Sequence, residues 1–198
     1  MIHKIDNNIP EIEAQLRQRV NTALSRHAKV MVVRYDLRFP DNQPYFDHSR
    51  YLSSFLNKLR HKLKHKGYDP IDFWVREQNY SLNPHYHCLL LLNGHKVQSL
   101  YGIFPVIESL WASIIGDSNP GLVEHCRQCT DWQINLNGCR LTRNNEQLYR
   151  QCLDWLEYMA KEYSKGNAPP HIREYGGSRI SGAAARQSCS PFSFQEKI

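Results

Sequence analysis

The chain has no apolar run that approaches the roughly 18 residues of a membrane span. Its N-terminus is too polar for a secretory signal peptide. It also has no Gly-x-x-x-x-Gly-Lys-Ser/Thr motif, which excludes a P-loop ATPase within this chain. We therefore expect a soluble protein of the cytoplasm with no membrane partner, and its six cysteines would normally stay reduced there.

A complete zinc signature is also missing. Cys126 and Cys129 form a Cys-x-x-Cys, which is half of a structural zinc site. No second pair follows, because Cys139 and Cys152 stand alone. Free thiols are the favoured interpretation, with zinc at Cys126 and Cys129 as the alternative.

Acidic charge is in short supply, since 25 Lys and Arg residues face 19 Asp and Glu residues. The net charge of +6 and the pI near 9.0 favour a polyanionic partner such as nucleic acid. His61 and His65 lie one helical turn apart in the basic segment 60–66. A solvated basic face is the favoured interpretation of that segment, with phosphate contacts or metal ligation as alternatives.

The most informative segment is His85-Tyr86-His87, which runs into an apolar stretch that closes at Asn93-Gly94. A short run of this kind predicts a buried β-strand. Side chains alternate along a strand, so His85 and His87 leave the same face about 6.6 Å apart. Two imidazoles at that separation can bind one metal ion together.

A carboxylate should join the two histidines. Residues 72–77 read as a second strand, and the polar residues 78–84 return the chain as an antiparallel hairpin. Glu77 ends one strand where His85 begins the next, which completes a set of two histidines and one carboxylate. The alternative is a pair of ordinary, hydrogen-bonded histidines at a strand start.

A late segment, residues 145–165, has the apolar spacing of an amphipathic helix. Tyr163 lies about 40° from the centre of its apolar stripe and should pack in the core, whereas Tyr158 lies about 100° away. Lys161 and Lys165 follow along the flank of Tyr158. A tyrosine beside two lysines at the margin of a packed face suits a nucleophile. An ordinary boundary tyrosine is the alternative, and Tyr163 is the second candidate nucleophile.

Taken in order, Glu77, Pro84-His85-Tyr86-His87 and Tyr158-Met159-Ala160-Lys161 resemble the motifs of the HUH endonucleases. In rolling-circle initiators of that superfamily, an upstream carboxylate joins the two histidines and a Tyr-x-x-Lys supplies the nucleophile. More narrowly, roughly residues 28–180 resemble the filamentous-phage replication proteins and the YagK/YfjJ C-terminal domain family.

The resemblance implies a metal-dependent, site-specific single-strand DNA endonuclease and strand transferase. Tyr158 would form a 5′-phosphotyrosine with help from Lys161, and Glu77, His85 and His87 would bind Mn²⁺ or Mg²⁺. Asp36 is an alternative to Glu77 as the acidic ligand. The candidate DNA-binding residues share a positive charge and are Arg34, Arg38, Lys165 and Arg179.

The implied biological role is initiation of rolling-circle replication of a phage or mobile element in the cytoplasm of a bacterial host. The implied partners are single-stranded DNA or an origin hairpin, together with a host helicase, since the chain lacks its own P-loop. A non-catalytic DNA-binding regulator of a prophage element and an HUH transposase or relaxase are the alternatives.

Mixed helices and strands with at least one hairpin predict an α+β fold. The resemblance implies a mainly antiparallel, about five-stranded sheet of RRM or ferredoxin-like type, with helices on one face and the metal site on the other. Residues 1–180 would form one domain and 181–198 a flexible tail. Helices are predicted at 10–27, from 47 or 49 to 66, from 97 or 105 to 115, and at 145–165, and further strands at 30–38, 121–126, 132–136 and 172–175.

Overall fold

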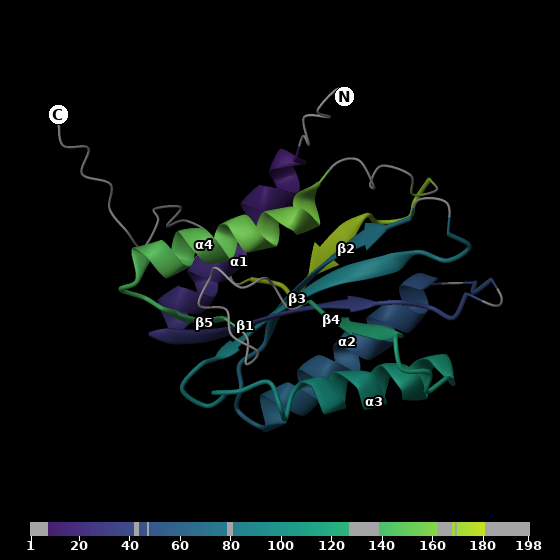
Figure 1. The fold of residues 1–198 in the computed structure, drawn as a ribbon, viewed down its shortest axis with the longest axis horizontal. Coiled ribbons are helices and arrows are strands. Elements are labelled where there is room, and N and C mark those ends of the chain that lie inside the picture. The colour runs from purple at the N-terminus through teal and green to yellow at the C-terminus, as the bar shows by residue number, and fades with distance from the viewer. Residues whose placement is uncertain are drawn as a thin grey trace.

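The computed structural model describes residues 8–41, 44–46, 48–78, 81–126, 139–161, 168 and 170–180. Helices and strands are interspersed along these residues (Figure 1). The helices are α1 (Pro10–Arg26), α2 (His48–His65), α3 (Phe104–Ile115) and α4 (Glu146–Glu157), followed by a single 3₁₀ turn, η1 (Tyr158–Ala160). The strands are β1 (Lys29–Leu37), β2 (Ile71–Glu77), β3 (His85–Asn93), β4 (Val123–His125), β5 (Cys139–Thr142) and β6 (Tyr175–Gly177).

The α+β class and the antiparallel sheet are confirmed, with six strands where about five were expected. The strand order is β4-β1-β3-β2-β6, and β5 pairs with the other end of β1. The β2–β3 hairpin is antiparallel and places Glu77 opposite His85. The first strand lies beside the histidine strand, as predicted, and its register places Asp36 opposite His87.

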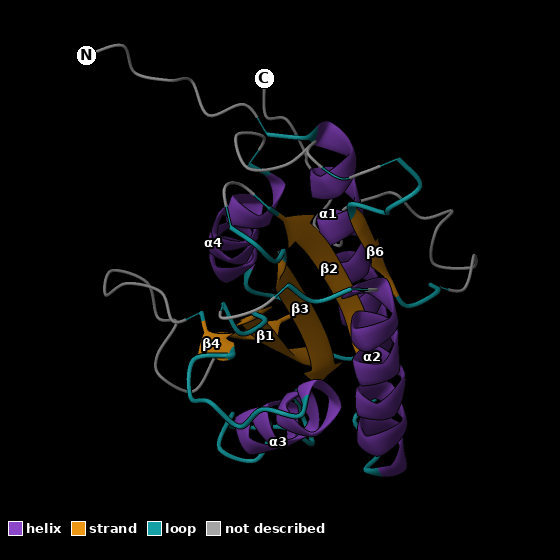
Figure 2. Cartoon of the chain, turned by 90° about the vertical axis from the view of Figure 1, so that its right-hand side faces the viewer, coloured by secondary structure: helices purple, strands orange, loops and turns teal. Residues whose placement is uncertain are grey.

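Helices cover both faces of the sheet, so the prediction of helices on one face alone is wrong. In Figures 1 and 2, α1 and α4 lie on one side of the strands, and α2 and α3 lie on the other. Each pair closes its own hydrophobic core. Both faces are apolar because β3 has no alternation of polar and apolar residues between Cys88 and Leu92, so either face of that strand needs a covering layer.

The side-chain alternation of β3 decides where the histidines point. Leu89 and Leu91 belong to the core beneath α1 and α4, whereas Leu90 and Leu92 belong to the core beneath α2 and α3. Residues two apart share a face, so His85 and His87 continue the row that lies on the α1/α4 side. The histidines therefore lie at one end of a helix-covered face rather than on a bare sheet surface.

Some element boundaries differ from the prediction. The last helix ends at Glu157, and Tyr158 begins the 3₁₀ turn. The strand predicted at 121–126 is the shorter β4, and the edge strand predicted at 172–175 is shifted to β6. The strand β5 was not predicted. The strand predicted at 132–136 and the tail 181–198 lie outside the described residues, and the single-domain assignment stays a prediction.

The first two helices match their predicted ranges closely. α1 begins at Pro10, and its side chains Ile12, Leu16 and Val20 are buried against the sheet. Within the described part of the chain, no helix combines the length and the apolar character that crossing a bilayer requires.

Candidate active site

The three predicted metal ligands meet at one end of the sheet. One ligand atom from each of Glu77, His85 and His87 lies within 4.8 Å of the other two. Glu77 Oε2 lies 2.5 Å from His87 Nε2 and 3.6 Å from His85 Nε2. Glu77 and His87 are buried, and the His85 side chain is 27% exposed, so the cluster opens to solvent on the side of His85. One carboxylate and two imidazoles form a donor set that fits a divalent cation.

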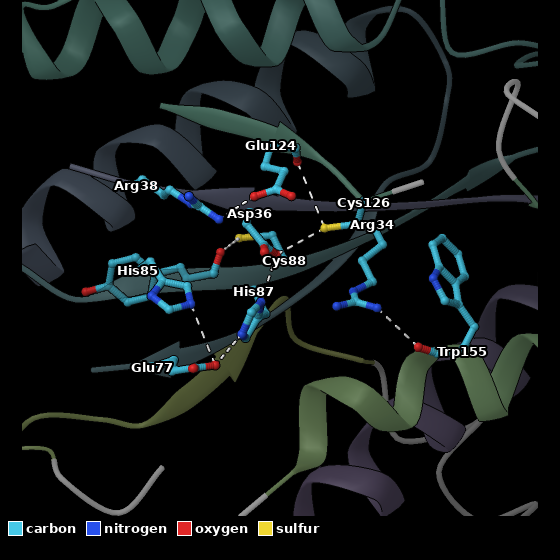
Figure 3. A network of polar contacts seen from close by, with 11 residues as sticks. Arg34, Asp36, Arg38, Glu77, His85, His87, Cys88, Glu124, Cys126 and Trp155 are labelled. Atoms are coloured by element: carbon cyan, nitrogen blue, oxygen red, sulfur yellow. Dashed lines mark hydrogen bonds and ion pairs between the residues drawn. The ribbon is translucent and has the colours of Figure 1, made fainter. Parts of the chain in front are cut away.

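Asp36 lies beside this cluster, on β1, and contacts the other nitrogen of the central imidazole. Its Oδ1 is 2.8 Å from His87 Nδ1 and also accepts a hydrogen bond from Cys126 Sγ at 3.2 Å (Figure 3). With a proton on Nδ1, His87 donates to Asp36 and turns the Nε2 lone pair toward Glu77 and His85. A carboxylate in this place orients a metal-binding imidazole, which favours Glu77 over Asp36 as the acidic ligand.

The two histidines differ in their electrostatic surroundings. Burial lowers the pKa of His87, but hydrogen bonds with Asp36 and Glu77 outweigh burial and hold that pKa above its usual value. Burial and the neighbouring His87 lower the pKa of His85. Burial raises the pKa of Asp36, yet the hydrogen bond with His87 leaves it below its usual value. Asp36 therefore carries a negative charge against His87 at neutral pH.

Tyr158 reaches the cluster from the turn that follows α4. Its ring centroid lies 5.5 Å from that of His87, at an interplanar angle of 84°. The chain before α1 holds this turn in place, because Ile9 N donates to Ala160 O at 2.9 Å and Asn8 pairs with Lys161. The Tyr158 side chain is 38% exposed, so its position combines contact with the histidines and access from solvent.

Two cations lie near the Tyr158 ring. The Arg34 guanidinium carbon lies 4.4 Å from the ring centroid, and Lys161 Nζ lies 5.5 Å from it. Both separations are within the range of a cation–π contact. Arg34 is buried, and its Nε has no hydrogen-bond partner. Burial of an unpaired donor costs roughly 1–3 kcal/mol, so the position of this side chain calls for an explanation beyond packing.

The remaining predicted DNA-binding residues lie at different distances from the cluster. Arg38 is half-exposed and forms an ion pair with Glu124 on β4 (Figure 3). Arg179 is exposed and follows β6 near the Ile71 end of β2, about 20 Å along that strand from Glu77. The structure therefore brings Arg34 to the cluster, places Arg38 on its flank and leaves Arg179 apart. Lys165 lies outside the described residues.

The cysteine and second-tyrosine predictions fall partly outside the described residues, which do not include Cys129 or Tyr163. Cys126 contacts Asp36. Among the residues that the structure describes, it does not form a cluster with other cysteines. Burial raises the pKa of the Cys126 thiol, and the nearby Asp36 raises it further, so this thiol stays protonated at neutral pH.

Sequence reasoning missed two relationships in this site: the hydrogen bond that orients His87 and the stacking of Arg34 on Tyr158. The alternation of β1 puts Arg34 and Asp36 on one face, and this signal was available in the sequence. The side chains that Arg34 and Asp36 contact could not be read from the sequence, because the strand register and the end of α4 decide which side chains meet.

Comparisons with known proteins identify the family of this chain. The family model described as YagK/YfjJ C-terminal domain matches residues 2–178. An uncharacterized protein named YfjJ from Escherichia coli (strain K12) is 27% identical over 184 residues, which cover 76% of this chain and 86% of that relative. No solved structure was found to match. Since the family match spans most of its length, the chain belongs to the YagK/YfjJ C-terminal domain family.

Proposed function

We propose that this protein is an HUH-type endonuclease and strand transferase that cuts single-stranded DNA and starts rolling-circle replication of a phage or mobile element. It would act in the cytoplasm of a bacterial host. The observation that carries the proposal is the meeting of the Glu77, His85 and His87 cluster with Tyr158, whose ring lies 5.5 Å from that of His87. Tyr158 is far in sequence from Glu77, His85 and His87. Its contact with the His87 ring is therefore not a consequence of closeness along the chain.

The nucleophile in this proposal is the Tyr158 hydroxyl. Its Oη attacks the phosphorus of a DNA phosphodiester, a new O–P bond forms and the bond from phosphorus to the 3′ oxygen breaks. In net terms the phenolic proton passes to the departing 3′ oxygen. The products are a 5′-phosphotyrosine and a free 3′-hydroxyl. Because the phosphotyrosine is still an ester, attack by a 3′-hydroxyl can reverse the step and join strands.

The surrounding residues assist this transfer electrostatically. A Mn²⁺ or Mg²⁺ ion held by Glu77, His85 and His87 would polarise the phosphate as a Lewis acid, and imidazole ligands favour Mn²⁺. Lys161, 5.5 Å from the Tyr158 ring, offsets the negative charge that develops during attack. Asp36 keeps the His87 ring in one orientation through its hydrogen bond with Nδ1.

The DNA would approach over the basic side chains that flank the cluster, Arg34 and Arg38. The net charge of +6 supports a polyanionic substrate, either a single strand or the loop of an origin hairpin. Unwinding would fall to a host helicase, because the chain lacks a P-loop.

The test is capture of the covalent intermediate. A random-sequence single-stranded DNA pool, labelled at its 3′ end, is incubated with the protein and Mn²⁺ and separated under denaturing conditions. A 5′-phosphotyrosine retains the labelled fragment, so the protein band should carry label. EDTA should abolish this band, and Tyr158→Phe should reduce it at least 100-fold. Tyr101→Phe, a change at a tyrosine that is 83% exposed, is the matched control and should leave it unchanged.

An undiminished labelled band in Tyr158→Phe would remove Tyr158 from the mechanism. Tight DNA binding with no labelled band in any divalent metal, and no effect of His87→Ala on that binding, would instead support a non-catalytic DNA-binding regulator.

A further inference from the structure

Arg34 occupies an unusual position for an arginine. It lies in the central strand β1, and only 7% of its surface is exposed. Its Nη1 donates to Trp155 O at 3.3 Å, and its guanidinium carbon lies 4.4 Å from the Tyr158 ring centroid. Figure 3 shows the guanidinium between His87 and Trp155. Its Nε is buried and has no hydrogen-bond partner.

The positive charge of Arg34 is only partly compensated. Among the described residues, no ion pair includes Arg34. Asp36 shares its face of β1 and interacts electrostatically with Arg34, but Oδ1 of Asp36 accepts hydrogen bonds from His87 and Cys126. Buried cations in proteins are normally paired and hydrogen-bonded, and buried N–H groups are normally satisfied. An anionic group bound at this site would pair with the Arg34 charge and would accept a hydrogen bond from its Nε–H.

We propose that Arg34 forms a phosphate subsite beside the metal-ligand cluster and binds the phosphodiester that is presented to Tyr158. The Nε–H, together with an Nη–H of the same planar fork, matches the spacing of two non-bridging phosphate oxygens. The stacked ring of Tyr158 then lies against the group that holds its target. One part of this proposal rests on the proposed function, namely that the phosphate bound by Arg34 is the one that Tyr158 attacks.

A purely structural role for Arg34 makes a different prediction. If its task were only to bind Trp155 O and hold the end of α4, its replacement would alter stability and leave the contribution of every DNA phosphate unchanged. If Arg34 binds a phosphate, its replacement must remove the energetic contribution of one particular phosphate in the DNA. The coupling between the arginine and one phosphate therefore separates the two roles.

The experiment is a neutral-phosphate scan in EDTA, so that no metal contributes. A single-stranded oligonucleotide isolated from a random pool by binding to the protein is resynthesised with one methylphosphonate at each position in turn. With the unsubstituted protein, one position should lose about tenfold in affinity, as expected for removal of a charge-assisted hydrogen-bonded contact. In Arg34→Met, the normal oligonucleotide should bind about tenfold more weakly, and the penalty at that position should fall below about twofold.

Two further variants give the scan its controls. Arg34→Lys keeps the charge and loses the planar fork, so it should show a penalty of intermediate size at the same position. Arg150→Met removes a positive charge from a side chain that is 60% exposed on α4, and it should retain the full penalty. Circular dichroism and thermal unfolding establish that each variant is folded, and Arg34→Lys carries the test if Arg34→Met does not fold.

A flat scan with the unsubstituted protein would overturn the proposal. So would a penalty that persists undiminished in a folded Arg34→Met or in Arg34→Lys. The scan and the covalent-capture assay fail independently: a protein that forms no phosphotyrosine in Mn²⁺ but shows the Arg34-dependent position would refute the nuclease and still support the phosphate subsite.

Discussion

At the scale of single residues, Asp36 has the most informative position. It is buried, it is not one of the three candidate metal ligands, and its Oδ1 lies 2.8 Å from Nδ1 of His87. Carboxylates in this relation to a metal-binding histidine set the orientation and the basicity of the ring. We therefore expect its contribution to appear in Mn²⁺ affinity, although Asp36 is not one of the three candidate ligands.

We predict that Asp36→Asn weakens Mn²⁺ binding by about 10- to 100-fold in titration calorimetry, the range found for such orienting partners. Asn is nearly the same size, so the fold should be retained. Asp154→Asn makes the same change of charge at an exposed position on α4 and should have little effect. Equal Mn²⁺ affinities for Asp36→Asn and the unsubstituted protein would show that Asp36 does not support the site.

A second buried carboxylate, Asp72 on β2, should influence stability rather than activity. Burial raises its pKa, although Arg60 and Arg19 act in the opposite direction. A raised pKa in the folded state means that folding favours the protonated form. The contribution of Asp72 to the free energy of unfolding is therefore largest below its unfolded pKa of about 3.9 and declines as pH rises through the higher folded value.

Asp72→Asn removes this titration. We expect the stability of the variant, relative to that of the unsubstituted protein, to increase as the pH is raised from about 4 to 7, as measured by urea denaturation at each pH. A relative stability that decreases over this pH range would mean that the Arg60 ion pair, 3.2 Å away, outweighs the burial of Asp72.

At the scale of secondary-structure elements, the end of α4 decides where Tyr158 lies. Asn145 is the N-cap of the helix, and its side chain accepts a hydrogen bond from Leu148 N at 2.9 Å. It ends at Glu157, where the 3₁₀ turn starts. Its buried residues, including Cys152, Trp155 and Leu156, fix the helix against the sheet, so the turn projects Tyr158 toward the histidines.

Removal of this helix cap should cost measurable stability. Asn145→Ala is expected to lower the free energy of unfolding by about 1 kcal/mol, the usual effect of losing an N-cap side chain. Asn144→Ala, at the exposed neighbouring position, serves as the control and should change it by less than about 0.5 kcal/mol. Equal losses in the two variants, measured by denaturant unfolding, would show that the Asn145 bond is not a stabilising cap.

The elements differ in how well the sequence predicted them. The β2–β3 hairpin and the Glu77–His85 pairing were predictable, because β-rich runs flank a polar turn. The end of α4 was not, because the helical spacing of Cys152, Trp155 and Met159 continues past Glu157 although the backbone tightens there. β5 escaped prediction because it has only four residues and takes its stability from pairing with β1.

At the scale of the whole molecule, the second helical layer is the largest difference between the predicted and the observed fold. Leucines on both faces of β3 already signalled a strand covered on each side, but the family resemblance led to the expectation of helices on one face. The covering helices α1 and α4 matter for the site, since α4 leads into Tyr158 and the residues before α1 pair with Ala160 and Lys161.

The candidate site is therefore a product of the complete fold. β1 supplies Arg34 and Asp36, the central hairpin supplies the three candidate ligands, and η1 supplies Tyr158. Metal-ligand residue types and their local spacing were readable from the sequence, whereas the contacts among β1, β3 and η1 depend on long-range packing. This is why the proximity of Glu77, His85 and His87 could be predicted and the network around them could not. That the three residues bind a metal ion stays a prediction.

The most direct test of the central claim is identification of the residue that becomes attached to DNA. The covalent product formed in Mn²⁺ is digested with a protease and a nuclease, and the modified peptide is sequenced by mass spectrometry. A 5′-linked nucleotide is expected on Tyr158 and none on the exposed control, Tyr101. A nucleotide on any other residue, or a protein that binds DNA yet never becomes attached to it, would show that Tyr158 is not the nucleophile of a DNA-cutting reaction.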